Sequence, residues 1–455
     1  MIYRVKDYGA DAEGKRLNTE IVQRLVDLCF ENGGGKIVFD GGRYALSTVF
    51  LKSDVHIEIA ADAEILGAES YYDYAQEEKV SYPIYQDSSH TYYHPSMFVG
   101  IDCENVSITG KGRIDMRSVW DEDGVRGKAI KHRGAKCIAL KNCKNVEIGD
   151  LEIANATDLA VYFAGCENVE VYGLKLRVYI DGISPDNSKK VKIHDCDIEA
   201  GDDGIVFKSS YTLNRLDICK DIRVFDCKIK SRCNAIKFGT ETNGGFENIR
   251  IENIEMYDTR ITGVSIESVD GAIVDGVTIR NVKMRNVNAP IFIHVGKRMR
   301  GPVGREIGKI KNVTLENIVA DGPYGGYPIV AWNYYSYRAG DFYQDPHVFG
   351  VAESFDGTKY AENWQMTSNI CGLKESPLEN IILRNIRLRL DGGVQTYSEE
   401  VPEEAQDYPE VYVYGRILPA KGIYFRHIKG LTLEKVTVET YREDARRDFV
   451  FEDVE

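Results

Sequence analysis

The 455-residue chain is predicted to fold as a parallel β-helix, a solenoid in which short strands stack coil upon coil. One phrase, Asn or another small polar residue followed by alternating apolar residues, returns along most of the chain. It recurs after 23 and 22 residues between Val146, Val169 and Val191. Alternation with period two indicates strands. A fixed period with few two-residue hairpin signals favours this all-β solenoid over a β-sandwich.

The repeat predicts one domain over residues 1–455, with a cap and entry over about 1–70. Steps longer than one coil indicate loops, and two inserted loops are expected at about 71–97 and 322–377. Both inserts are rich in Tyr, which suits stacking on sugar rings and equally suits packing within the inserts. The repeat is centred on these apolar residues: Val106, Val146, Val169, Val191, Ile222, Ile249, Val277, Val313, Ile381 and Leu431.

Near the start of the chain, the apolar residues follow the spacing of a helix instead of the alternation of a strand. Ile21, Leu25 and Val26 recur at helical spacing, with Asn18 or Thr19 as the N-cap and the glycines at 33–35 as the end. An amphipathic helix at this point is expected to cap the open end of the β stack and to protect its edge from pairing.

Composition excludes several classes of function. A net charge of −14 without a block of Lys or Arg argues against a nucleic-acid groove. No run of 18 apolar residues occurs, so neither a transmembrane helix nor a membrane partner is expected. The opening MIYRVKDYGA lacks the pattern of a signal peptide, which favours the cytoplasm unless a leader has been removed.

The cysteines are predicted to pack in the core. Five of them each precede a short strand-like run, which suggests one equivalent, stacked position per coil. No Cys-x-x-Cys pair occurs, so no zinc site is expected, and we predict neither metal nor cofactor. The five are Cys103, Cys143, Cys166, Cys196 and Cys227.

Three aspartates form the strongest candidate for chemistry. Asp181 lies 21 residues before Asp202, nearly one coil, so the two carboxylates are expected on adjacent strands about 4.8 Å apart. Gly201 and Gly204 permit a distortion that brings Asp203 to the same side. Converging carboxylates raise at least one pKa and suit glycoside hydrolysis, with one acid and one base. The alternative reading is that Asp-Gly pairs mark turns.

Several stretches resemble glycoside hydrolase family 28, the polygalacturonase-type enzymes. They are DYGADAEGK, GGGKIVFDGGRY and FLKSDVHIEI near the start, GKGRIDMRSVW at 110–120, and the run from 181 to 209 with its Gly-Asp-Asp-Gly. The resemblance covers most of residues 1–320. It implies a single-stranded, right-handed parallel β-helix and hydrolysis with inversion.

Residue by residue, the resemblance makes Asp202 the general acid, and it makes Asp181 and Asp203 the pair that activates water. Lys208 matches a substrate-binding lysine of the family. The position of the Gly-His-Gly histidine is taken by Asn234.

The family's Arg-Ile-Lys motif, which grips a substrate carboxylate, reads Ser265-Ile266-Glu267. An Arg binds a carboxylate with two hydrogen bonds, whereas Glu267 is expected to repel a uronate. If the substrate is a uronate, other cations would have to bind its carboxylate in place of the missing Arg and Lys. The alternative is that these cations are ordinary surface charges. The candidates are Lys208, Lys237, Lys297 and Arg298.

Three further residues are weaker candidates for substrate binding, beside Lys208, Asn234, Lys237, Glu267 and Arg298. Glu241 could bind sugar hydroxyls or be an ordinary loop carboxylate. Trp332 could be a stacking platform for a sugar ring or a side chain of the core. His294, in a strand-like run, is expected to be a hydrogen-bonded rim or core histidine rather than a catalyst.

The chain is therefore expected to be an inverting, exo-acting glycoside hydrolase on plant cell-wall-type (pectic) oligosaccharides or glycosides. The long inserts, by closing one end of a groove, favour exo cleavage. A polysaccharide lyase on the same scaffold and a non-catalytic glycan-binding β-helix are the alternatives. A lyase needs a cation for the uronate carboxylate, and a binding protein needs no cluster of like charges.

Overall fold

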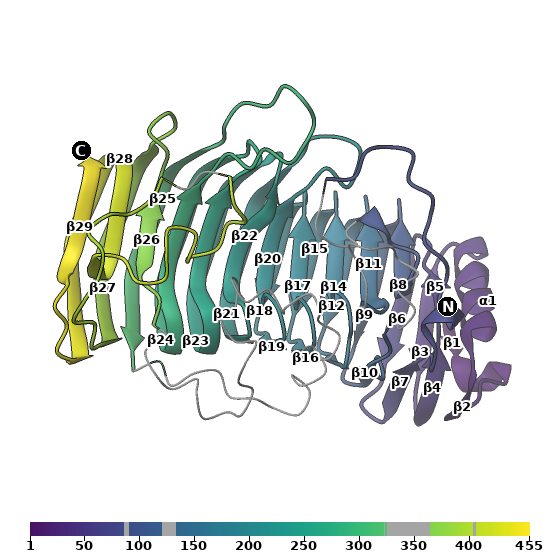
Figure 1. Ribbon diagram of the computed structural model, residues 1–455. Helices are drawn as coiled ribbons and strands as arrows, with labels where there is room; N and C mark the ends of the chain where they lie inside the picture. The colour runs from purple at the N-terminus through teal and green to yellow at the C-terminus, as the bar shows by residue number, and fades with distance from the viewer. Residues whose placement is uncertain (86–90, 121–132, 323, 325–364, 404–405) are drawn as a thin grey trace. The chain divides into compact units, whose positions relative to one another are not determined.

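A computed structural model describes residues 1–85, 91–120, 133–322, 324, 365–403 and 406–455 (Figure 1). The chain divides into two compact units. Among the described residues, the first comprises Met1–Gly201 and Thr212–Arg215, and the second comprises Asp202–Tyr211 and the chain from Leu216 onward. That residues 1–455 form a single domain stays a prediction. No helix among the described residues has the length and apolar character needed to cross a membrane.

The first unit is a parallel β-helix whose coils each contribute up to three short strands. Three stacks run through it, for example β6–β9–β12–β15–β18, and all of their pairings are parallel. Its elements are β1 (Ile2–Arg4), η1 (Val5–Tyr8), β2 (Glu13–Leu17), α1 (Thr19–Glu31), β3 (Gly35–Phe39), β4 (Gly42–Leu46), β5 (Val49–Phe50), β6 (Val55–Ile59), β7 (Ala63–Gly67), η2 (Tyr71–Asp73), β8 (Ser96–Ile101), β9 (Glu104–Gly110), β10 (Arg113–Asp115), β11 (Lys136–Lys141), β12 (Lys144–Gly149), β13 (Glu152–Ala154), β14 (Val161–Ala164), β15 (Glu167–Tyr172), β16 (Lys175–Val178), β17 (Ile183–Asp186), β18 (Lys189–His194) and β19 (Asp197–Ala200).

The second unit continues the parallel pattern with longer strands that bend and take part in two stacks. One half of β23 pairs with β21, and the other half pairs with β22. The strands are β20 (Ile205–Ser209), β21 (Ile218–Ser231), β22 (Asn234–Thr242), β23 (Gly245–Ser268), β24 (Ile273–Val295), β25 (Lys309–Asp321), β26 (Ser368–Cys371), β27 (Leu378–Gly392), β28 (Ala420–Arg442) and β29 (Arg447–Val454).

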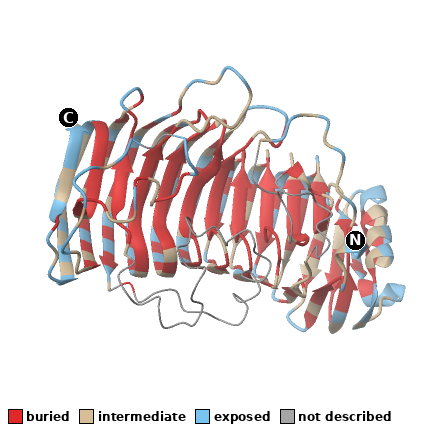
Figure 2. Cartoon of the chain, viewed as in Figure 1, coloured by how far each residue is buried: buried red, intermediate tan, exposed pale blue. Residues whose placement is uncertain are grey.

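The predicted repeat centres are confirmed by the strand register. In the first unit Val106, Val146, Val169 and Val191 lie side by side on four successive strands. In the second unit the same is true of the six remaining centres from Ile222 to Leu431. All ten side chains are buried except Leu431, which is half-buried, and Figure 2 shows buried residues along the strands of both units.

A helix is present where the spacing predicted one. Helix α1 buries Val22, Leu25, Val26 and Cys29, and it packs against β3, β5 and β6. Its expected capping role and the right-handed coil stay predictions. The insert at 71–97 contains η2 and the start of β8, whereas most of the insert at 322–377 lies outside the described residues.

The prediction of a five-membered cysteine row is wrong. Cys103, Cys143 and Cys166 do occupy one position, because the strands that follow them pair in register. Cys196 instead follows the register of Leu174, and Cys227 pairs with Ile254. In the second unit, Cys219 lies three residues before a repeat centre and so matches the first three. All ten cysteines are buried and unoxidised.

Asparagines explain the polar residue that opens each repeat. Asn105, Asn145 and Asn168 all have left-handed backbone angles, with φ of 55°, 54° and 58°. Their side chains form a ladder in which Nδ2 of Asn145 donates to Asn105 at 2.9 Å and Nδ2 of Asn168 donates to Asn145 at 2.8 Å. Asn accepts the left-handed turn better than most residues do, so the turn and the ladder select the same residue.

We expect Asn145→Ala to destabilise the protein by about 1–2 kcal/mol, because alanine disfavours a positive φ and cannot continue the ladder. Asn145→Gly is the matched control, since glycine keeps the backbone angle and loses only the hydrogen bonds. Denaturant unfolding measures both. Equal losses in the two variants would mean that the backbone angle contributes nothing.

Candidate active site

Two consecutive carboxylates of the second unit converge ahead of β20. Oxygens of Asp202 and Asp203 lie within 4.8 Å of each other and of the Cys233 sulfur. Adjacent residues of a regular strand would point to opposite faces. Gly204 makes the distortion possible, because a Cβ at this position would lie 2.6 Å from the Ala235 carbonyl oxygen. Asp203 is buried and Asp202 is partly exposed, as suits a general acid that must reach a substrate.

Asn234, at the start of β22, holds the carboxylate of Asp203. Its backbone N–H donates to Asp203 Oδ1 at 3.0 Å, and its side-chain Nδ2 donates to the same oxygen at 2.8 Å. The position where the family has a histidine is therefore occupied by a neutral donor that fixes one carboxylate. The side chain of Asn234 has no exposed surface.

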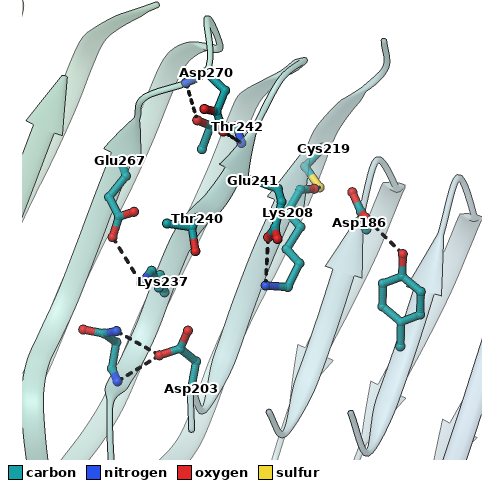
Figure 3. Close-up of polar contacts among 12 residues, drawn as sticks. Asp186, Asp203, Lys208, Cys219, Lys237, Thr240, Glu241, Thr242, Glu267 and Asp270 are labelled. Carbon is teal, nitrogen blue, oxygen red and sulfur yellow. Dashed lines mark hydrogen bonds and ion pairs between the residues drawn. The ribbon is translucent and has the colours of Figure 1, made fainter. Parts of the chain in front are cut away.

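Lys237 lies at the centre of a buried charge cluster. It pairs in register with Val206 on β20 and with Ser265 on β23. Glu267, two residues after Ser265, shares that face, and its Oε1 lies 3.5 Å from Lys237 Nζ (Figure 3). Ser265 Oγ donates to the same Oε1 at 2.6 Å. The substituted Arg-Ile-Lys motif thus supplies an internal partner for Lys237.

The second partner of Lys237 comes from a distant segment. Residues 406–418, which we call the strap, precede β28 and place Glu410 Oε1 2.6 Å from Lys237 Nζ. Both oxygens of Glu410 also lie 3.5 Å from Asn234 Nδ2. Sequence reasoning missed Glu410, since it lies outside the repeat and 173 residues from its partner.

Burial and charge act in opposite directions on this cluster. Burial disfavours the charge on Lys237, but Glu267, Glu410 and Asp203 together hold its pKa well above the usual value. Burial raises the pKa of Glu267 to about 7, against the opposing effect of Lys237. Oε2 of Glu267 is buried and has no hydrogen-bond partner in the described parts of the chain, which favours the protonated carboxyl.

The other candidate cations are also paired with carboxylates of the protein. Lys208 Nζ lies 3.3 Å from Glu241 on β22 (Figure 3). The Arg298 guanidinium forks onto both oxygens of Asp270, at 3.0 and 2.5 Å. The four pairs, including the exposed one at the surface, are Lys208–Glu241, Lys237–Glu267/Glu410, Arg298–Asp270 and Lys297–Glu375.

The remaining predicted residues fall in different places. His294 is buried, stacks on Phe292 and forms a 2.9 Å hydrogen bond between Nδ1 and the Tyr414 hydroxyl, as expected for a hydrogen-bonded core histidine. Asp181 is buried in the first unit, where its carbonyl accepts from Ala160. Its grouping with Asp202 and Asp203 stays a prediction. Trp332 lies outside the described residues.

The Asp202–Asp203–Cys233 group has the spacing of a metal site but not the chemistry of one. Burial, followed by the charges of Asp202, Asp203 and Glu410, raises the pKa of the Cys233 thiol well above its usual value. Metals bind the thiolate rather than the thiol, and hard cations prefer oxygen ligands. The expectation that no metal takes part stays a prediction.

We expect Glu267→Gln to change how stability depends on pH. Between its unfolded value of 4.5 and its folded value of about 7, the Glu267 carboxyl keeps its proton only in the folded state. Folded protein then binds more protons, so stability falls as pH rises through this window. Unfolding at pH 5 and pH 8 should show the wild type losing stability relative to the variant. A difference that stays constant with pH would contradict the raised pKa.

Comparison with known proteins identifies the family. The model of "Glycosyl hydrolases family 28" matches residues 50–323. A probable polygalacturonase of Vitis vinifera is 22% identical over 402 residues, 84% of this chain and 73% of the relative. The family 28 exopolygalacturonase of Yersinia enterocolitica superposes with a TM-score of 0.67 at 19% identity, over 100% of this chain and 78% of that one.

A hyperthermoactive exopolygalacturonase of Thermotoga maritima has a TM-score of 0.63 at 18% identity, over 86% of this chain and 87% of that one. At these identities the two structures show the shared β-helix fold. The matched region makes up more than half of the chain. It contains Asp202 and Asp203 ahead of β20, Lys237 on β22 and Glu267 on β23, whereas Glu410 lies beyond it. The chain therefore belongs to glycosyl hydrolases family 28 and is a glycosidase.

Proposed function

We propose that the protein is an inverting, exo-acting glycosidase that removes a neutral sugar from pectic oligosaccharides or glycosides. Family membership and relatives named polygalacturonase and exopolygalacturonase support the pectic class. Asp202 serves as general acid, and Asp181 and Asp203 activate the attacking water. Asn234 orients Asp203 through two hydrogen bonds to one of its oxygens.

The charge of the sugar is the part of the proposal that the geometry supports most directly. Each of the four candidate cations already faces a carboxylate of the protein: Lys208, Lys237, Lys297 and Arg298. A uronate at the cleaved position would have to displace one of these partners. The same pairs argue against a lyase, which needs a cation to neutralise the uronate carboxylate.

The strap supports exo cleavage. The Val411 carbonyl accepts from Asn369 on β26, and Tyr414 contacts His294 on β24. Strap residues therefore cover the outward side chains of these strands, which follow β22 and β23 in the stack. A groove closed at this side suits removal of one residue from a chain end. The length of the tyrosine-rich inserts is a separate argument for exo cleavage, since long loops can close one end of a groove.

Two finer points of the fold belong to the same proposal. We propose that α1 caps the first coils, which its contacts with β3, β5 and β6 support, and that the coil is right-handed as in the family. A carbohydrate is the proposed partner, and the cytoplasmic location stays a prediction.

We expect Asp202→Asn to lower kcat by about 10²–10⁴-fold, because it removes the titrating acid while keeping the shape of the side chain. The loss should shrink for an aryl glycoside with a good leaving group, which needs less protonation. Product chromatography on oligosaccharides and release of the aryl group are the measurements. Near-normal turnover of a natural oligosaccharide would show that Asp202 is not the acid, and an unsaturated, ultraviolet-absorbing product would indicate a lyase.

We expect polygalacturonate to be a poor substrate. The candidate cations are already paired with carboxylates of the protein, so a uronate carboxylate gains no cation in exchange for its lost hydration unless it displaces one of those partners. The measurement is reducing-sugar release from polygalacturonate, compared with release from neutral pectic oligosaccharides. Rapid release from polygalacturonate would mean that one of the paired lysines or Arg298 exchanges its partner for the substrate.

A further inference from the structure

Glu410 forms a carboxylate-binding arrangement within the protein itself. Its side chain is 5% exposed, and Oε1 lies 2.6 Å from Lys237 Nζ. Both of its oxygens lie 3.5 Å from Asn234 Nδ2, which also donates to Asp203 at 2.8 Å. An ammonium and an amide N–H converging on one carboxylate are the groups that proteins use to bind a substrate carboxylate. Here an internal side chain occupies that position.

The strap holds this carboxylate in place at several points. On one side of Glu410, the hydroxyl of Tyr408 lies 3.0 Å from Thr240 Oγ1 on β22. On the other side, the Val411 carbonyl accepts from Asn369 at 2.8 Å, and Tyr414 bonds to His294. Because contacts on both sides fix the backbone, Glu410 faces Lys237 with little freedom to move away.

Glu410 faces polar and charged groups from three other segments. The interactions of these groups are the ones that removal of Glu410 would change. Lys237 and Asn234 belong to β22, Glu267 reaches Lys237 from β23, and Asp203 accepts from Asn234 ahead of β20. The ring of Tyr408, 46% exposed, lies 5.8 Å from Lys237 Nζ. Among the described residues, Lys237 without Glu410 would keep the Glu267 carboxyl at 3.5 Å and the Tyr408 ring, and Asn234 would keep Asp203.

We propose that Glu410 is a built-in carboxylate ligand of the active site, which excludes a substrate carboxylate from Lys237 and positions Asn234 against Asp203. The specificity part of this inference rests on the proposed function, because it concerns the sugar bound beside Asp203. Glu410 is a positioning and specificity-determining residue: it touches the side chains that hold the reacting carboxylate rather than the reacting atoms.

The first test is independent of activity. Glu410→Ala leaves a vacant position that fits a small carboxylate, so sodium acetate should raise the Tm of this variant by about 2 °C or more over sodium chloride of equal ionic strength. The wild type and Glu410→Gln should show no such difference, since their side chains fill the position. Glu375→Ala is the matched control, because it also removes a carboxylate 2.7 Å from a lysine, but at the surface.

The second test measures catalysis on a neutral substrate. We expect Glu410→Ala to lose about 10²-fold in kcat, through misplacement of Asn234 and Asp203, and to recover most of it in acetate. Glu410→Gln should lose about tenfold in kcat with KM changed less than about twofold, and acetate should not restore it. Galacturonate should stabilise Glu410→Ala more than galactose does, whereas the wild type should not discriminate in its favour.

The outcomes separate this inference from the proposed function. An acetate-specific gain in stability confirms the vacant carboxylate position even if the wild type hydrolyses no glycoside, in which case the proposed function alone fails. Absence of any acetate effect in a folded Glu410→Ala variant overturns the inference. If that variant does not fold, the isosteric Glu410→Gln variant decides, and an unchanged kcat overturns the positioning role.

Discussion

The stacking of equivalent residues on parallel strands governs both units. Once one coil is in register with the next, each side chain lies about 4.8 Å from its counterpart and must be compatible with it. Apolar rows such as Val106, Val146, Val169 and Val191 satisfy this requirement by packing. Asparagine rows satisfy it because an amide can donate to the coil before it and accept from the coil after it.

The same constraint shapes the charges in the outward rows of the second unit. A buried lysine placed by the register beside an apolar or neutral row would be left uncompensated, at a cost of several kcal/mol. Lys237 avoids this cost because it is paired with Glu267 on the next strand and with Glu410 of the strap. Lys208 and Glu241 form a second buried pair nearby. The carboxylates that compensate these buried cations are also their direct partners, so in the proposed function charge compensation and the exclusion of a uronate have the same cause.

This link gives a physical meaning to the departures from the family pattern. Where the family pattern has Arg-Ile-Lys, this chain has Ser265-Ile266-Glu267, so two cations are absent and a carboxyl is added. The carboxyl is compatible with the site because Lys237 and Ser265 surround it and because its raised pKa lets it hold a proton near neutral pH. Asn234 likewise stands in place of a titrating histidine, and its neutral side-chain amide donates to Asp203 and lies 3.5 Å from both oxygens of Glu410. The substituted residues Asn234, Ser265 and Glu267 are therefore connected to one another through Lys237 and Glu410.

The sequence by itself determined the features that repeat. Local spacing and family motifs predicted the coil length, the ten repeat centres, the N-terminal helix and the candidate aspartates. This was possible because each coil of a solenoid repeats the same short-range sequence pattern. Even there, the cysteine row was misjudged: a Cys before a strand-like run at 196 or 227 looks like the one at 166, and only the register of Leu174 and Ile254 assigns them to other rows. The tertiary structure alone decided the partners of the charges. Glu410 reaches Lys237 across 173 residues of chain, from a segment without a repeat pattern. No local preference encodes such a contact, since it depends on the contacts of the strap with Thr240, Asn369 and His294, which lie far from it in the sequence.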